Sequence, residues 1–262
     1  MQGSANLNLM IKAARMAGRS LAKDFREVEN LQVSLKGAAD FVSKADIAAE
    51  EIIKEELMGA RKNYGWVGEE SEAEEGEDPT RRWIVDPLDG TTNFLHGMPH
   101  WAVSIALEFK GEIVSAVIYD PSKDEIFTAE KGQGAFLNES RLRVSARKRL
   151  IECVFSTGVP FAGRDGLPEN LQEIARLMPT CAGLRRWGAA ALDLAYVAAG
   201  RYDGFWERGL QSWDMAAGIL IARESGALVE PIEPGADILE SGEIICASEP
   251  IFDQFSKIIR DV

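Results

Sequence analysis

The stretch Trp-Ile-Val-Asp-Pro-Leu-Asp-Gly-Thr-Thr-Asn-Phe, residues 83–94, decides how the chain is organised around it. Its apolar start predicts a strand that delivers two acids, Asp86 and Asp89, at a bend containing Pro87. The Gly-Thr-Thr-Asn run that follows is suited to open a helix. Because the bend lets both carboxylates turn toward one point, we expect them to meet the first N–H groups of that helix there.

This convergence indicates metal-assisted phosphate chemistry. Unpaired N–H groups at a helix N-terminus bind an oxyanion, and here they would belong to Gly90, Thr91 and Thr92. Carboxylates repel an anion unless divalent cations lie between them, and hard oxygen ligands favour Mg²⁺. The segment therefore predicts phosphoryl transfer or phosphate-ester hydrolysis. Taken alone, it is also compatible with a capped turn.

Length and composition indicate a soluble globular protein of one large domain or two small ones. The chain has 262 residues, of which 46% are hydrophobic and 27% charged. A formal net charge of −13 disfavours nucleic acid and membrane surfaces as partners. The start lacks the pattern of a signal peptide, and no apolar run is long enough to span a bilayer. Three scattered cysteines are typical of a reducing compartment, so we expect a cytoplasmic protein.

Hydrophobic periodicity predicts an α+β half followed by an α/β half. Helices are expected over 5–28 and over 46–58, the second capped by Ser43 or Asp46. A β-meander should follow, with strands at 83–85, 101–109, 113–119 and 125–129. Beyond residue 150, expected strands at 153–156, 202–206, 227–229 and 244–247 alternate with expected helices at 169–178, 189–199, 213–224 and 249–260. The basic run near 140–150 is the best junction, so we expect domains at 1–145 and 146–262, packed as layers of helices and sheets.

Two further acidic motifs accompany the central one. Gly-Glu-Glu-Ser at 68–71 ends a short strand, and Trp-Asp-Met-Ala-Ala-Gly at 213–218 places an acid in the first turn of a helix that Ser212 is suited to cap. The three motifs, in this order and at these separations, resemble the inositol monophosphatase family of magnesium-dependent, lithium-sensitive sugar phosphatases. The resemblance covers nearly the whole chain. It implies a layered α/β/α/β/α sandwich of the inositol monophosphatase/fructose-1,6-bisphosphatase type.

The resemblance also implies roles for the residues that match the motifs. Five positions resemble metal ligands, the last two of them for the second metal: Glu69, Asp86, Leu88, Asp89 and Asp214. Asp86 would be shared by two metals, and Leu88 would contribute its backbone carbonyl. Glu69, together with Thr91, would orient the attacking water. Asp46 would support the waters of a third, loosely held metal, whereas Glu70 is open between shaping the local field and being part of a solvated acidic loop.

The substrate contacts are likewise implied by the resemblance. The positions concerned are Asp89, Gly90, Thr91, Arg185, Ala190, Glu207 and Asp214. The N–H groups of Gly90 and Thr91 would hold phosphate, Glu207 would hydrogen-bond a sugar hydroxyl, and the amide of Ala190 would make a second contact. Arg185 resembles a basic residue near the substrate mouth or the dimer side. The two histidines, at 96 and 100, are expected to pack or to line the rim.

The sequence therefore predicts Mg²⁺-dependent hydrolysis of a small sugar or cyclitol phosphate monoester, with inositol 1-phosphate as the first choice. Fructose-1,6-bisphosphatase or another nucleotide or sugar phosphatase activity is the alternative within this class. The segment 188–191 is Gly-Ala-Ala-Ala where the family has a Ser or Thr at the second position, which removes a helix cap worth ~1 kcal/mol. The resemblance also implies a homodimer. A second, non-enzymatic role is open, in which the protein binds RNA polymerase or RNA-processing factors.

Overall fold

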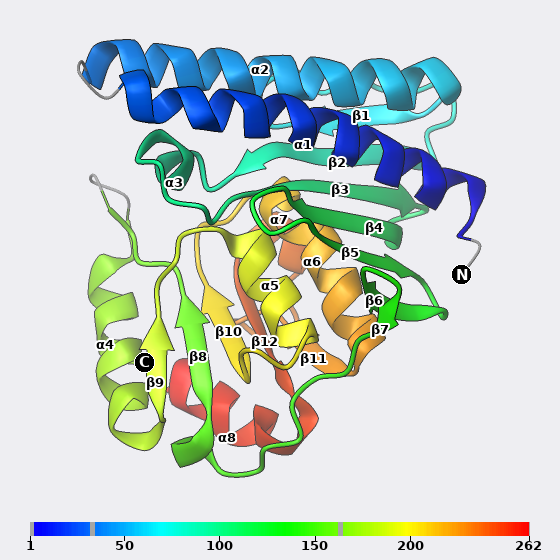
Figure 1. The fold of residues 1–262 in the computed structure, drawn as a ribbon. Helices are drawn as coiled ribbons and strands as arrows, with labels where there is room; N and C mark the ends of the chain where they lie inside the picture. Colours follow the sequence, from blue (N-terminus) through cyan, green and yellow to red (C-terminus); the bar gives the residue numbers. More distant parts are fainter. Residues whose placement is uncertain (1–2, 32–34, 162–164, 262) are drawn as a thin grey trace.

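The computed structural model describes residues 3–31, 35–161 and 165–261 (Figure 1). Within these ranges the strands form a seven-stranded and a five-stranded sheet. Helices α1 (Ala5–Leu31) and α2 (Leu35–Ala60) lie side by side over the outer face of the first sheet (Figure 1). In this part of the chain no helix is long and apolar enough to cross a membrane.

The first sheet follows the chain order from β1 to β7. Its strands are β1 (Gly65–Gly68), β2 (Arg81–Asp89), β3 (Ala102–Phe109), β4 (Glu112–Asp120), β5 (Glu125–Glu130), β6 (Gly134–Leu137) and β7 (Ser140–Arg141). β1 is parallel to β2, and every later pair is antiparallel. Trp83 and Val85 face the core beneath α1 and α2, whereas Ile84 faces the central core. Because both faces of β2 are buried at its centre, residues 83–85 form a continuous apolar run.

The second sheet has the order β11-β12-β10-β8-β9. Its strands are β8 (Val154–Thr157), β9 (Gly183–Arg185), β10 (Gly204–Glu207), β11 (Ala227–Glu230) and β12 (Ile244–Ser248). Helices α5 (Ala190–Ala198) and α6 (Ser212–Ser225) lie between the two sheets, and α4 (Leu167–Leu177) and α8 (Glu249–Arg260) cover the far face of the second one (Figure 1). Short helices α3 (Thr91–Leu95) and α7 (Ile238–Ser241) complete the fold, with 3₁₀ turns at Leu150–Glu152 and Met178–Thr180.

This arrangement confirms the expected α+β class and the α/β/α/β/α layering. Apolar side chains of α1 at the predicted spacing are buried, as Met10, Ala14 and Leu21 show with no exposed surface. The four strands of the meander are confirmed as β2 to β5. The division at residue 145 stays a prediction, because α5 and α6 of the second half pack against strands of both sheets.

Two expected helix starts are wrong. The second helix begins at Leu35 rather than near Asp46, so neither Ser43 nor Asp46 caps it, and Asp46 is a buried residue in its middle. An Asp caps a helix only at its N-terminus. Here tertiary packing extends α2 toward the N-terminus, so Asp46 lies in the interior of the helix. In α6 the N-cap is Gln211, not Ser212, because Gln211 and Asp214 form a reciprocal capping box.

Candidate active site

Strand β2 ends in an irregularity that brings its two acids to the same place. The pairing with β3 is regular as far as Asp86 and shifts register before Asp89. Pro87 lies at the shift, where the missing N–H of a proline is tolerated. The Oδ1 atom of Asp86 accepts a hydrogen bond of 2.9 Å from the N–H of Leu88, which holds the bend. Both carboxylates are buried, with 1% of Asp86 and 8% of Asp89 exposed.

The two acids share their surroundings with other carboxylates. Burial raises the pKa of Asp86 well above its usual value, and the charges of Glu69 and Asp89 raise it further. Burial, followed by the charge of Asp214, likewise raises the pKa of Asp89. One interaction opposes this, since the N–H of Ala191 donates to Oδ2 of Asp89 at 2.8 Å. Several acids are therefore crowded here, and they can all be ionised only beside positive charge.

Glu69 and Asp46 reach this cluster from different elements. Glu69 follows β1, and its N–H donates to the carbonyl of Val85 on β2 at 3.2 Å. Glu69 keeps an exposed side chain, yet partial desolvation raises its pKa to about 7, while a hydrogen bond with Asp86 lowers this pKa and the charge of Asp214 raises it. Asp46 is 2% exposed and its Oδ1 atom has no hydrogen-bond partner in the described part of the chain. Burial, helped by the charges of neighbouring glutamates, raises the pKa of Asp46 to about 8.

One acid of this region received no role from the sequence. Glu50 is 3% exposed, and its Oε2 atom accepts a hydrogen bond of 2.8 Å from the N–H of Glu70. It also lies against Gly68, where an added Cβ would come within 2.6 Å of the same oxygen. Asp46 and Glu50 are one helical turn apart, which was the available signal that both face the same way. Glu50 fixes the segment that carries Glu69, whereas Glu70 contributes a backbone N–H and a charge.

The residues after Asp89 form a tight turn. Gly90 is the N-cap of α3 and has a φ of 93°. This left-handed backbone conformation is rare for residues other than glycine. The hydroxyl of Thr91 donates to the carbonyl of Leu88 at 3.1 Å and faces Asp46, whose pKa it lowers. The predicted helix is present but spans only Thr91–Leu95. Its dipole is small at this length, so an anion at this turn would be bound by the backbone N–H groups rather than by the helix dipole.

A buried amide joins this turn to the second half of the chain. The Nδ2 atom of Asn93 donates to the carbonyls of His100 and Trp187, each at 2.8 Å. The segment with Ala190 is thereby held beside Gly90. Sequence reasoning missed this role, since an Asn in a turn has many local uses. His100 packs against the Trp187 ring at 5.3 Å between centroids, and burial lowers its pKa to about 4.

The remaining positions come from the second half. Ala190 is the first residue of α5, and Asp214 lies in the first turn of α6, where its Oδ2 atom accepts the N–H of Gln211 at 2.7 Å. Glu207 is the last residue of β10, and its charge raises the pKa of Asp89. Arg185 ends the edge strand β9, is exposed, and donates to the carbonyl of Leu184 at 3.0 Å.

The donor set fits a hard divalent cation. Among the described residues, no group of three or more His, Cys, Asp or Glu side chains is placed to hold a metal ion as the side chains stand. Crowded carboxylates repel one another in the absence of positive charge, so their side chains stay apart. In addition, one oxygen of Asp214 and the carbonyl oxygen of Leu88 each accept a local hydrogen bond. The Oδ1 atom of Asp46 is buried without a hydrogen-bond partner in the described residues, and the pKa values of Asp86 and Asp89 are raised by burial and by neighbouring acids. A bound cation would compensate both features. All these ligand atoms are oxygen, which suits Mg²⁺.

Comparisons with known proteins agree with this chemistry. The model of the inositol monophosphatase family matches residues 5–261. The chain is 57% identical over 260 residues to the inositol-1-monophosphatase of Rhizobium meliloti (strain 1021), covering 99% of this chain and 98% of that protein. It is 45% identical over 254 residues to Nus factor SuhB of Pasteurella multocida (strain Pm70), covering 97% and 95%. The crystal structure of extragenic suppressor protein suhB from Bartonella henselae superposes with a TM-score of 0.90 at 55% identity, covering 98% of this chain and 99% of that one.

Proposed function

The chain belongs to the inositol monophosphatase family, and we propose from this that it is a phosphoric monoester hydrolase acting on a small sugar or cyclitol phosphate, with inositol 1-phosphate as its preferred substrate. One observation carries the proposal. Buried Asp86 and Asp89 lie on one bend, next to the N–H groups that follow Gly90, and acids from other elements raise the pKa values of both. Such an arrangement is suited to phosphate together with divalent cations and to little else.

The residues that would hold Mg²⁺ are Glu69, Asp86, the carbonyl of Leu88, Asp89 and Asp214. When bound, Mg²⁺ lowers the pKa of a water molecule and stabilises charge on the leaving oxygen. The bend at Pro87 directs the two aspartates together, and the Ala191 N–H fixes the rotamer of Asp89. Asp46 supports water from the side of α2.

The chain's own groups position the water and the phosphate. We assign to Glu69 and Thr91 the orientation of the attacking water, because Glu69 interacts with Asp86 and the hydroxyl of Thr91 faces Asp46. The N–H groups of Gly90 and Thr91 would hold the phosphate oxygens. Since the turn is already formed, little reorganisation is needed when phosphate binds.

The alcohol part of the substrate would lie against the second half of the chain. Glu207 would accept a hydrogen bond from a sugar hydroxyl, and Ala190 would contribute its amide at the start of α5. We assign Arg185, on the exposed edge strand, to the mouth of the site. Ala189 stands where the family has a Ser or Thr. It is the N-cap residue of α5 and makes no side-chain hydrogen bond, which supports the loss of a helix cap at this position.

A substrate panel tests the proposal. The kcat/KM values of the purified protein would be measured with Mg²⁺ for inositol 1-phosphate, fructose 1,6-bisphosphate, a nucleotide monophosphate and histidinol phosphate. We expect the highest value for inositol 1-phosphate. A higher value for the bisphosphate would replace the proposed activity by the alternative within the class, and no turnover of any monoester would refute it.

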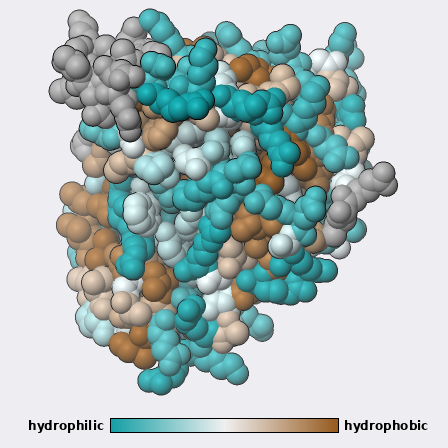
Figure 2. Space-filling view, in the orientation of Figure 1, coloured by the Kyte–Doolittle hydropathy of each residue, from teal (hydrophilic) through white to brown (hydrophobic). Residues whose placement is uncertain are grey.

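We further propose that the protein is a homodimer that works in the cytoplasm. Large apolar side chains are exposed on α4 and around it: Phe161, Leu167, Leu171, Met178 and Trp187. Figure 2 shows hydrophobic surface along the edge of the molecule where α4 lies. An exposed apolar face of this kind favours a partner, and a second copy is the one that the family suggests. All three cysteines lie in the described residues and are free and buried, which supports a reducing compartment.

A second role outside catalysis has one observation in its favour. A relative with 45% identity is named Nus factor SuhB, a name that does not describe a phosphatase. The exposed basic residues within the segment 141–149, which connects the first sheet to the second along the chain, offer a binding surface on an otherwise acidic protein. Copurification of RNA polymerase with the tagged protein tests this role, and no enrichment over a tagged control would remove it.

A further inference from the structure

Strand β10 presents its side chains alternately to two different layers. Phe205 belongs to the central core between the sheets, whereas Trp206 belongs to the outer core beneath α4 and α8. Successive side chains of a strand point to opposite faces, so Glu207 shares the face of Phe205, and Arg208 shares the face of Trp206. The residues on either side of Glu207 are therefore held in the outer layer, away from the site.

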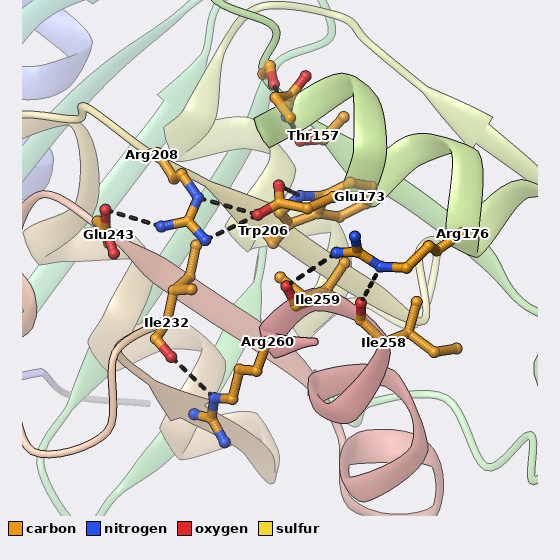
Figure 3. A network of polar contacts seen from close by, with 12 residues as sticks. Thr157, Glu173, Arg176, Trp206, Arg208, Ile232, Glu243, Ile258, Ile259 and Arg260 are labelled. Atoms are coloured by element: carbon orange, nitrogen blue, oxygen red, sulfur yellow. Dashed lines mark hydrogen bonds and ion pairs between the residues drawn. The ribbon is translucent and has the colours of Figure 1, made fainter. Parts of the chain in front are cut away.

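One buried carboxylate holds both of those neighbours (Figure 3). Glu173 of α4 has no exposed surface, and its Oε2 atom accepts the indole N–H of Trp206 at 2.8 Å. Its Oε1 atom accepts Nε and Nη2 of Arg208 at 3.0 and 2.8 Å. Arg208 also pairs with Glu243, next to β12, at 2.9 Å. The side chains on both sides of Glu207 are thus bound by a single side chain of α4.

The same helix face also holds the surface against which Glu207 lies. A Cβ added at Gly158 would come within 1.7 Å of Oε1 of Glu207, so this carboxylate lies directly on the glycine backbone. The Nδ2 atom of Asn170 donates to the carbonyl of Gly158 at 3.1 Å and to the hydroxyl of Thr157 at 3.4 Å. Asn170 and Glu173 are three residues apart and lie on one face of α4.

A buried ionic group of this kind is a weak contributor to stability. The desolvation of Glu173 offsets much of its attraction to Arg208, so the group's main effect is to select one geometry. Here the selected geometry is that of the Glu207 carboxylate, bounded by Gly158 on one side and by a pinned strand on the other.

We propose that Glu173 and Asn170 are positioning residues that place the carboxylate of Glu207 for substrates carrying hydroxyl groups. The inference rests on the proposed role of Glu207 in binding a sugar hydroxyl. Through these two residues, α4 sets the selectivity for the alcohol part of the substrate, while the acids that would hold metal belong to other elements.

The test compares Glu173→Gln with a matched control on the same helix. Arg176 also anchors α4, by donating to the carbonyls of Ile258 and Ile259 at 2.9 and 3.3 Å, and both of these partners belong to α8 (Figure 3). The kinetics of Glu173→Gln and Arg176→Gln would be measured at saturating Mg²⁺ with inositol 1-phosphate and with p-nitrophenyl phosphate, which has no hydroxyl to bind. Thermal unfolding would match the two variants for stability.

We expect Glu173→Gln to lower kcat/KM for inositol 1-phosphate about tenfold, mainly through KM, as for losing one hydrogen bond to a charged group. The kcat/KM of Glu173→Gln with p-nitrophenyl phosphate should change by less than about twofold. The kcat/KM of Arg176→Gln should also change by less than about twofold with either substrate. In a Glu207→Gln background, Glu173→Gln should add less than about twofold, because its effect passes through Glu207. If Glu173→Gln does not fold, Arg208→Gln replaces it, because Arg208 is partly exposed. We expect the same changes in kcat/KM for this variant.

Equal losses with both substrates would overturn the inference, since they would show a general structural effect. The inference would also be overturned if Glu173→Gln lowered kcat/KM by the full tenfold in the Glu207→Gln background. It would be overturned likewise if Glu173→Gln caused no selective loss of kcat/KM for inositol 1-phosphate. A wild-type protein that does not hydrolyse inositol 1-phosphate would refute the proposed function first. An active, selective wild type whose Glu173→Gln variant behaves like Arg176→Gln would refute the inference alone.

Discussion

Replacement of Asp46 by Asn measures how strongly the carboxylate cluster opposes folding when no metal is bound. Burial raises the pKa of Asp46 from 3.8 to about 8, so the native state binds a proton at pH 7 that the unfolded state has released. Since the native pKa is the higher one, this group destabilises the native state increasingly as the pH rises from about 4 to 8. The penalty amounts to about 4 kcal/mol at pH 7 and about 2 kcal/mol at pH 5.

The Asn variant is neutral in both states and removes this penalty. Urea unfolding with a chelator present should therefore show Asp46→Asn to be more stable than wild type, by up to about 4 kcal/mol at pH 7 and by about half of that at pH 5. Glu55→Gln is the matched control, because it removes the same charge from an exposed position of α2 and should have little effect. Added Mg²⁺ should stabilise wild type more than Asp46→Asn. A variant less stable than wild type at pH 7, or a difference independent of pH, would refute the reasoning.

Three further outcomes are expected. Chelation should abolish turnover and Mg²⁺ should restore it, with inhibition by lithium in the millimolar range that the family implies; turnover that survives the chelator contradicts the metal mechanism. Asp89→Asn should lower kcat by orders of magnitude together with Mg²⁺ affinity, whereas Thr91→Ala should lower kcat roughly 10²–10³-fold at nearly unchanged affinity. Equal losses of affinity in the two variants would show these roles to be wrong. Light scattering should find a dimer at micromolar protein and a monomer after Leu171→Glu with Trp187→Glu; a monomeric wild type would disprove the proposed assembly.

The sequence predicted best where a pattern is local and repeated. The spacing of Met10, Ala14 and Leu21 predicted α1, and apolar alternation around Lys110 predicted the hairpin of β3 and β4. The start of α2 was predicted wrongly because a polar residue inside a helix looks like a cap until its surroundings are known. Strands as short as β7 and β9 carry too few residues for any periodicity, and only their hydrogen bonds to neighbours define them.

The candidate site divides in the same way. Asp86, Asp89 and Gly90 lie in one continuous segment, so their proximity could be argued from a strand, a bend and a turn. Glu50 and Asn93 acquire their roles from partners elsewhere in the chain, namely the N–H of Glu70 and the carbonyl of Trp187. Nothing local distinguishes such residues from an ordinary helical acid or a turn amide, so sequence reasoning passed over both.

The sequence by itself determined the family of this protein, because three acidic motifs in fixed order carry the resemblance that the family model matches over residues 5–261. Only the tertiary structure decided how strongly the acids are perturbed and which residues hold them in place. The pKa of Asp46 depends on burial and on glutamates from other segments, and the place of Glu207 depends on Gly158 and on Glu173 of α4. Burial, electrostatic repulsion and buried hydrogen bonds act through space between distant segments, so they exist only once the layers have packed.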